Sequence, residues 1–162
     1  MTAEALLDSN VVVAMLVEAH EHHRPSLALV AGGTRPELAV CAHSYAEAYS
    51  TLTRRSEHAP FRFTAEEAWD ALESLRAITV LVGLTPAQTF DTIRSYARTG
   101  GIGARLYDRL IGEAAVAHGV GTLITWNVGH MRSLFPSLTV STPTAFQSPT
   151  TLAVPGSGSE SS

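Results

Sequence analysis

Short apolar segments alternate with longer amphipathic ones along most of the chain. Each apolar segment has three or four residues and predicts a β-strand. The predicted strands are 5–7, 38–41, 79–82, 122–125 and 138–140. Between them, apolar residues at helical spacing predict helices at 12–18, directly after Pro25, at 44–54, from Thr64 onward, at 86–98 and at 103–118. This alternation is typical of an α/β protein whose parallel sheet is covered by helices on both faces.

The length and the ending of the chain predict one folded domain followed by a tail. A chain of 162 residues suffices for a single domain, which we place at residues 1–147. After Gln147 the composition shifts to Ser, Thr, Pro and Gly, which bury too little apolar surface to order a segment. Residues 148–162 are therefore expected to form a flexible tail or a linker.

Targeting signals are not evident in the sequence. No segment approaches the ~20 apolar residues of a membrane helix, and the first residues lack the basic and apolar stretches of a signal peptide. The single cysteine, Cys41, excludes an internal disulfide and fits a reducing compartment. We expect a cytoplasmic protein without a membrane partner.

The charges of the chain narrow the classes of function. The formal net charge is −4, and all 11 basic residues are arginines. A basic face for nucleic acid is therefore not expected, although a bound metal ion can itself attract phosphate. Without lysine, the chain cannot be a Walker A nucleotide-binding protein, a Schiff-base enzyme, or a phosphoryl-transfer enzyme of the haloacid dehalogenase or receiver type.

Asp8 directly follows the first predicted strand and is a candidate site residue. In open α/β sheets, ligands bind outside the carboxyl ends of the strands. The alternative is that Asp8 only caps the helix that follows it.

Asp108 is a second candidate, because its helical neighbours form a small, apolar stripe. These neighbours are Ala104, Ile111, Gly112 and Ala115. A carboxylate on such a face is unfavourable unless it is paired or binds a cation. Pairing with the nearby Arg105 or Arg109 is the alternative to a functional role.

Three other polar residues have weaker local signals. Glu47 shares its helical face with polar residues, which is typical of a solvated face. Asn127 ends the fourth predicted strand, where it either lines a site or caps the next helix. His130 is a candidate ligand, proton carrier or solvated surface residue.

Two conspicuous patterns carry no functional prediction. The histidines His20, His22 and His23 lie in an expected exposed connection between two helices, and their spacing does not match a zinc site. The glycine-rich segment 100–103 precedes a helix but lacks the full phosphate-loop pattern and does not follow a strand. We expect it to be a flexible connection.

Taken in order, four segments resemble the PIN-domain family, in particular the VapC-type toxins of toxin–antitoxin pairs. They are LLDSN at 6–10, SYAE at 44–47, LYDRLI at 106–111 and LITWN at 123–127. The segment TPTAF at 142–146 resembles the usual ending of the family. The resemblance covers residues 4 to 147.

This resemblance implies a fold and a site. The fold is a three-layer α/β/α arrangement with a five-stranded parallel sheet of order 3-2-1-4-5. Asp8 and Asn127 would flank one crevice, and Glu47 and Asp108 would point into it. The three carboxylates would hold Mg²⁺ or Mn²⁺, which prefer oxygen ligands, and Asn127 would complete the catalytic set. Many family members have Asp near position 127, so we expect one tightly bound ion in this chain.

The resemblance also implies an activity and partners. The protein would be an endoribonuclease toxin that cleaves RNA phosphodiester bonds and is neutralised by a VapB-like antitoxin. A homodimer is expected, and the first helices show more apolar surface than one sheet face needs unless they simply cover the sheet. This surface consists of Val12, Val13, Leu16, Val17, Leu27, Leu29 and Val30.

Two rival functions compete with this interpretation, and the sequence supports them unequally. A PIN module with a decayed site would act only in binding antitoxin or RNA, and Asn127 keeps this alternative open. A phosphoryl-transfer enzyme with Asp8 as nucleophile would need an aspartate at position 10, where the chain has Asn10, and a lysine.

Overall fold

The sheet is assembled from strands that are distant in sequence. A computed structural model describes residues 2–32 and 35–147, so the expected tail at 148–162 lies outside the described residues. The strands are β1 (Ala5–Leu7), β2 (Leu38–Cys41), β3 (Val80–Val82), β4 (Thr122–Ile124) and β5 (Thr139–Ser141). They form one parallel sheet of order β3-β2-β1-β4-β5. The predicted strand order is therefore confirmed.

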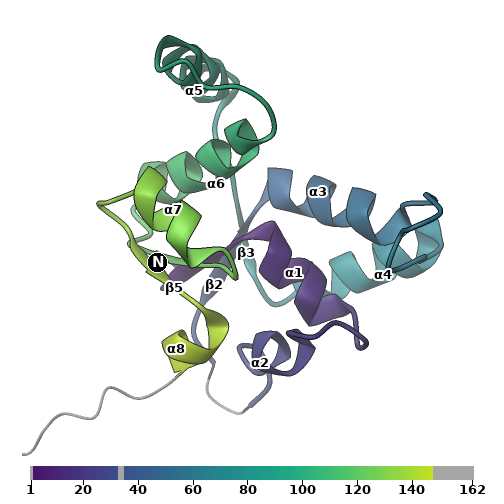
Figure 1. Cartoon of the computed structure of the whole chain (residues 1–162). Helices are drawn as coiled ribbons and strands as arrows, with labels where there is room; N and C mark the ends of the chain where they lie inside the picture. Colours follow the sequence, from purple (N-terminus) through teal and green to yellow (C-terminus); the bar gives the residue numbers. More distant parts are fainter. Residues whose placement is uncertain (1, 33–34, 148–162) are drawn as a thin grey trace, which may run out of the picture.

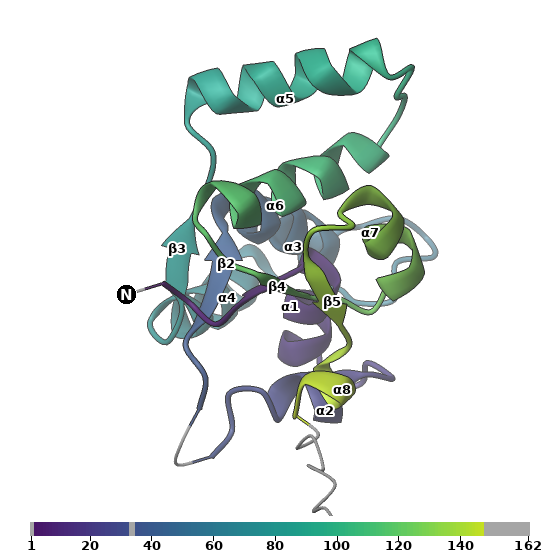
Figure 2. The ribbon, with the colours of Figure 1, turned by 90° about the vertical axis from the view of Figure 1, so that its left-hand side faces the viewer.

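Helices cover both faces of this sheet (Figures 1 and 2). One face carries α1 (Ser9–Leu16), α3 (Ala42–Thr53) and α4 (Ala65–Arg76), with α2 (His23–Leu27) beside α1. The other face carries α6 (Arg105–Ala117) and α7 (Val128–Leu134). The chain continues through α5 (Pro86–Arg98) before α6 and ends in α8 (Pro143–Gln147). The predicted three-layer α/β/α fold is confirmed.

Side chains along each strand point alternately to the two faces of the sheet, and they contribute to the core on both faces. Leu7 and Ile124 face the layer of α1, α3 and α4, whereas Leu6 and Leu123 face α6 and α7. Successive side chains of a strand point to opposite faces, so one pair of adjacent strands serves both cores. Leu6 lies directly opposite Leu123 in the register, which fixes β1 against β4 at the centre of the sheet.

Helix ends follow capping groups more closely than apolar periodicity. The helix predicted at 12–18 begins at Ser9, because Asp8 caps it and accepts a hydrogen bond from the Ser9 backbone N–H. Thr64 and Glu67 form the capping box that their spacing predicts, with reciprocal hydrogen bonds of 3.1 and 2.8 Å.

Most apolar residues of the first helices pack within the chain. Val12, Val13, Val17 and Leu29 are buried in the core beneath α1. These four residues cover the sheet, whereas Leu27 of α2 is 40% exposed, so part of the apolar surface considered for a homodimer stays accessible. No helix among residues 2–32 and 35–147 combines the length and apolar character needed to cross a membrane.

Helix α5 lies on the outer side of α6, away from the sheet (Figure 2). None of its residues is buried, and Phe90 is 64% exposed. The connection to α6 was predicted to be flexible, but it forms a defined turn. In this turn, Gly100 and Gly103 adopt positive φ angles of 76° and 72°, and the Tyr96 hydroxyl donates to the Ile102 carbonyl at 2.8 Å.

Close packing between α6 and the segment after α7 depends on a glycine. Gly112 is buried in α6, and a Cβ atom at this position would overlap the ring of Phe135. Phe135 is itself buried and belongs to neither sheet strand nor helix, so it can shift only by disturbing its neighbours. The small residue predicted on the Asp108 stripe is therefore required by packing.

We predict that Gly112→Ala lowers the free energy of unfolding by about 1–3 kcal/mol, because the added methyl group overpacks the Phe135 contact. Urea unfolding followed by circular dichroism measures this change. Gly129→Ala in α7 is the matched control, since a methyl group there would meet no packed neighbour within 4 Å. Equal stability of the two variants would show that Phe135 does not constrain α6.

Candidate functional site

Asp8 occupies the point where β1 ends and α1 begins. Its side chain is only 3% exposed. One carboxylate oxygen accepts the Ser9 N–H at 2.7 Å, and the other accepts the Thr125 hydroxyl at 2.8 Å. The sequence offered a helix cap and a site residue as alternatives for Asp8. The structure shows that the cap is present and that it leaves the carboxylate at the carboxyl end of the central strand.

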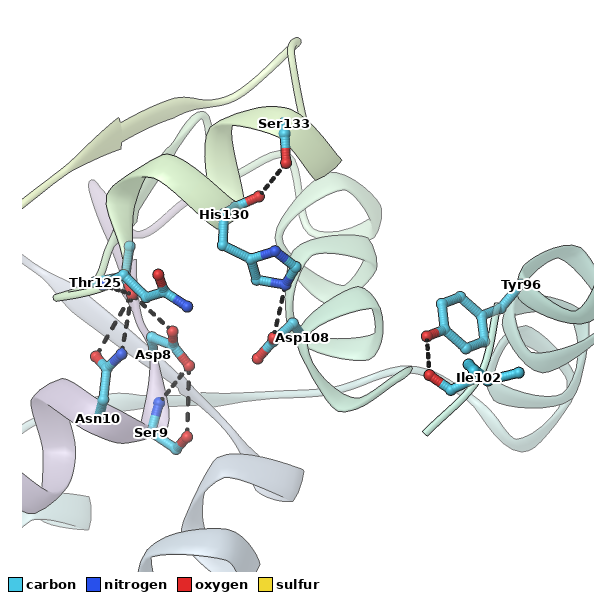
Figure 3. A network of polar contacts seen from close by, with 10 residues as sticks. Asp8, Ser9, Asn10, Tyr96, Ile102, Asp108, Thr125, His130 and Ser133 are labelled. Atoms are coloured by element: carbon cyan, nitrogen blue, oxygen red, sulfur yellow. Dashed lines mark hydrogen bonds and ion pairs between the residues drawn. The ribbon is translucent and has the colours of Figure 1, made fainter. Parts of the chain in front are cut away.

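Thr125 and Asn10 join the ends of β1 and β4 (Figure 3). The Asn10 amide nitrogen donates to the Thr125 hydroxyl oxygen at 3.1 Å. The Asn10 amide oxygen accepts the Trp126 backbone N–H at 3.1 Å. These bonds connect residues more than a hundred positions apart. They hold together Asn10, Thr125 and Trp126, which form the floor of the site next to Asp8.

Glu47 lies on α3 with one carboxylate oxygen, Oε1, buried and without a hydrogen-bond donor. The His43 Nε2 atom lies 3.2 Å from it but outside hydrogen-bonding geometry. Burial lowers the pKa of His43, which favours the neutral ring and leaves the Glu47 charge without a counterion. The His43 ring packs against Tyr107 of α6, with centroids 4.9 Å apart, and this contact brings α3 close to the start of α6.

Asp108 lies in the first turn of α6 and pairs with a residue of α7. Its Oδ2 atom is 3.0 Å from Nε2 of His130 (Figure 3). Arg109 instead contacts Glu113 at 3.8 Å, so the arginine pairing considered for Asp108 does not form. The sequence left the role of His130 open, and the structure gives it a position beside a candidate carboxylate.

The three carboxylates lie close enough for their charges to interact. Burial is the main cause of a raised pKa at Asp8, and the charge of Asp108 adds to it, while hydrogen bonds from Thr125 and Ser9 act in the opposite direction. Burial, followed by the charges of Asp8 and Asp108, raises the pKa of Glu47 to about 7. Mutual repulsion of this kind indicates a site with excess negative charge.

Asn127 is exposed at the start of α7. Its backbone N–H donates to the Thr125 hydroxyl at 3.0 Å, but its side chain forms no capping hydrogen bond. The cap considered for this residue is therefore absent. Thr125, two positions earlier, is the residue at the end of β4 that contacts Asp8.

The residues fit a hard divalent cation by their chemistry. The candidate donors are carboxylate oxygens, one of them buried without a donor, and none of the three is paired with arginine in the described part of the chain. Across residues 2–32 and 35–147, no group of three His, Cys, Asp or Glu side chains is already arranged around one point for an ion. Asp8, Glu47 and Asp108 are the residues that would hold it.

Sequence reasoning missed Thr125 and Asn10 as parts of the site. Their positions in the sequence were the only signal that could have identified them. Thr125 directly follows a buried strand, and Asn10 lies two residues beyond Asp8. A polar residue at each of two strand ends predicts an interaction only if those strands are adjacent. Their adjacency is a property of the folded sheet.

Comparison with known proteins identifies the family. The sequence model of the PIN domain matches residues 5–127, which is more than half of the chain. The protein is therefore a member of the PIN domain family. No curated protein sequence matches it at a significant level.

Solved structures share the fold at low sequence identity. VapC20 from Mycobacterium tuberculosis, a sarcin-ricin loop cleaving toxin, is 16% identical with a TM-score of 0.57, over 74% of this chain and 86% of that one. VapBC2 from Rickettsia felis is 17% identical with a TM-score of 0.57, over 84% and 96%. DNA-bound VapBC from Salmonella typhimurium is 17% identical with a TM-score of 0.58, over 87% and 98%.

We predict that Glu47→Gln stabilises the metal-free protein more at pH 8 than at pH 5. The folded-state pKa of about 7 exceeds the ordinary value of 4.5, so the folded state holds the proton more tightly than the unfolded state. Stability is therefore lost as pH rises from about 4.5 through 7, and the variant avoids this loss. After allowance for partial solvent exposure, the gain at pH 8 is about 1–2 kcal/mol.

Urea unfolding in metal-free buffer at both pH values tests this expectation. Glu73→Gln removes the same charge from an exposed position on α4 and is the control. A gain for Glu47→Gln of the same size at both pH values would contradict carboxylate crowding at the site.

Proposed function

We propose that the protein is a Mg²⁺- or Mn²⁺-dependent endoribonuclease toxin of the VapC type. The observation that carries this proposal is the convergence of Asp8, Glu47 and Asp108 at the carboxyl ends of β1 and β4, with their charges coupled and without an arginine partner among the described residues. Membership of the PIN domain family and a fold shared with a sarcin-ricin loop cleaving toxin support it.

The chain's own residues divide the work between binding and positioning. Asp8, Glu47 and Asp108 bind the cation, and Asn127 is the fourth residue proposed for the catalytic set. Thr125 orients the Asp8 carboxylate by donating to it, and His130 orients Asp108. When bound, the ion polarises the phosphodiester, stabilises charge on the leaving oxygen and lowers the pKa of an attacking water.

The three carboxylates are attached to regular elements of the fold, which suits the binding of a cation. Asp8 is held by two hydrogen bonds at a strand end, and Glu47 and Asp108 project from helices that pack on opposite faces of the sheet. These elements fix where each carboxylate is attached, and the side chains would turn toward a common ion on binding, since no three of them surround one point in the described residues. The decayed-site alternative is disfavoured, because a decayed site gains nothing from keeping unfavourable charges together.

A VapB-like antitoxin is the proposed inhibitor. Solved structures of similar fold are VapBC pairs, which supports a partner of this kind. Its inhibitory segment would carry arginine or lysine, because a basic side chain can pair with Glu47 or Asp108 in place of the metal ion.

We also propose a homodimer, on different grounds from those in the sequence. Of the residues first considered for it, Val12, Val13, Val17 and Leu29 are buried in the chain's own core, whereas Leu27 is 40% exposed. Helix α5 instead exposes an apolar stripe on which Phe90 is 64% and Ile93 is 40% exposed. A second copy covering α5 would remove this stripe from water. The domain boundary at 147 and a cytoplasmic location remain part of the proposal.

We predict that Asp108→Asn reduces Mn²⁺-dependent cleavage of RNA by at least about a hundredfold, because it removes one charge from the cation site while keeping size. Gel assays of RNA cleavage with and without chelator measure the activity, and circular dichroism confirms the fold. Asp70→Asn, which removes an exposed charge on α4, is the control. Full activity in Asp108→Asn would refute the site assignment.

We predict that Asn127→Asp tightens Mn²⁺ binding by about tenfold, since it adds a negative charge beside the end of β4 and ligand charge is a main determinant of affinity for hard cations. Calorimetric titration compares the two proteins. Gln88→Glu, which adds the same charge on α5, is expected to leave the affinity unchanged. An unaltered affinity in Asn127→Asp would place residue 127 outside the metal site.

A further inference from the structure

Four aromatic rings form a continuous row that starts at the candidate site. The Trp126 ring stacks on His22 with centroids 4.0 Å apart and an interplanar angle of 12°. His22 is followed by His20 at 5.8 Å, and His20 by Phe61 at 6.0 Å. Trp126 directly follows Thr125, so this aromatic row leads away from the floor of the carboxylate site.

A groove of about 260 Å³ is lined both by the far end of this row and by Glu47 of the candidate site. Glu47, His20 and Phe61 all line this groove. The remaining lining residues are Ser9, Asn10, Val13 and Thr51. A polymer with one phosphate at Glu47 would therefore place a neighbouring unit against two aromatic rings.

His20 is held as a neutral ring with one defined tautomer. Burial is the main cause of its lowered pKa, and the neighbouring His22 adds to it. The His22 backbone N–H donates to Nδ1 of His20 at 3.0 Å, so the ring proton lies on Nε2. A neutral imidazole with an N–H group can stack on the planar ring of a ligand, and it can also donate a hydrogen bond to an acceptor atom of that ligand. The sequence predicted His20, His22 and His23 to be exposed, but all three are half-buried, and His20 and His22 belong to the aromatic row.

Phe61 lies in a loop that two hydrogen bonds hold in place. In the segment between α3 and α4, the Phe63 N–H donates to the Leu52 carbonyl at 2.9 Å. Arg55 donates to the Phe63 carbonyl at 2.7 Å. Figures 1 and 2 show this loop on the same side of the molecule as the loop between α1 and α2, which carries His20. The ring is thus positioned by the fold before any ligand binds.

The same loop concentrates positive charge in an acidic protein. Residues 54–63 contain three arginines and a single glutamate, while the whole chain has a net charge of −4. All three guanidinium groups belong to exposed residues. Positive charge beside aromatic rings is the combination that binds the backbone and the bases of single-stranded nucleic acid.

We propose that this groove binds one unpaired nucleobase of the RNA next to the cleaved phosphodiester, stacked on Phe61 and His20. The inference rests on the proposed ribonuclease function and specifies its substrate. Stacking needs a base that is free of its helix, so the base bound in this groove comes from an unpaired segment of the RNA. Every base has an aromatic face, so the groove selects unpaired RNA more than a particular base.

Binding of a labelled single-stranded RNA to the full chain tests the proposal. Fluorescence anisotropy would be measured with Asp108→Asn as background, so that the RNA stays intact. Phe61→Leu keeps an apolar side chain but removes the ring, and we expect roughly tenfold weaker binding. Phe61→Tyr keeps the ring and should restore affinity. Trp69→Ala removes a ring that is 59% exposed on α4 and should have no effect.

A double-mutant cycle identifies the base itself. The RNA would carry one abasic nucleotide at each position in turn, and each RNA would be titrated with the parent and with Phe61→Leu. At one position the abasic nucleotide and Phe61→Leu should each weaken binding, and together they should weaken it no further than either alone.

Several results would overturn the inference. They are unchanged binding by Phe61→Leu, independent losses at every position, equally tight binding of duplex RNA, and no measurable RNA binding. Failure of the proposed function looks different: the unsubstituted chain with Mn²⁺ would cleave no RNA, while the coupling between Phe61 and one base persisted.

Discussion

The buried carboxylate of Asp8 both stabilises the fold and belongs to the candidate site. It caps α1 through the Ser9 N–H and accepts the Thr125 hydroxyl across the junction of β1 and β4. These two bonds supply only part of the hydration that a buried charge loses, and the pKa of Asp8 is accordingly raised. The charge that remains is felt by Glu47, whose pKa it raises further. The arrangement of the site therefore depends on how the protein accommodates this one carboxylate.

Such a site opposes folding in the absence of a cation. Carboxylates gathered at a strand end repel one another, and the chain places no arginine among them in its described part. The close packing of Gly112 against Phe135 and the burial of both sheet faces offset that cost. Proteins commonly keep local features that are unfavourable to stability where function requires them. Under the proposed function, a bound ion would balance this excess negative charge.

Under the proposed function, an acidic chain would recognise RNA through contacts other than a broad basic face. A metal ion attracts phosphate locally, and aromatic rings contribute uncharged surface for the bases. The row from Trp126 to Phe61 extends directly from the residues that support Asp8. Catalytic and substrate-binding elements would then share one framework, since Asn10 both holds Trp126 and lines the groove.

The sequence by itself determined the five strands and the helices α1 to α6 to within a few residues, the sheet order through family resemblance, the capping box at Thr64 and Glu67, and the place of Asp8 at a strand end. These features depend on periodicity, on short spacings or on motif order, all of which are visible along the chain. Only the tertiary structure decided that Asp108 pairs with His130 and not with arginine, that Thr125 meets Asp8, and that His22 stacks on Trp126. The physical reason is that these contacts join distant segments, and their geometry depends on which strands and helices become neighbours when the sheet forms.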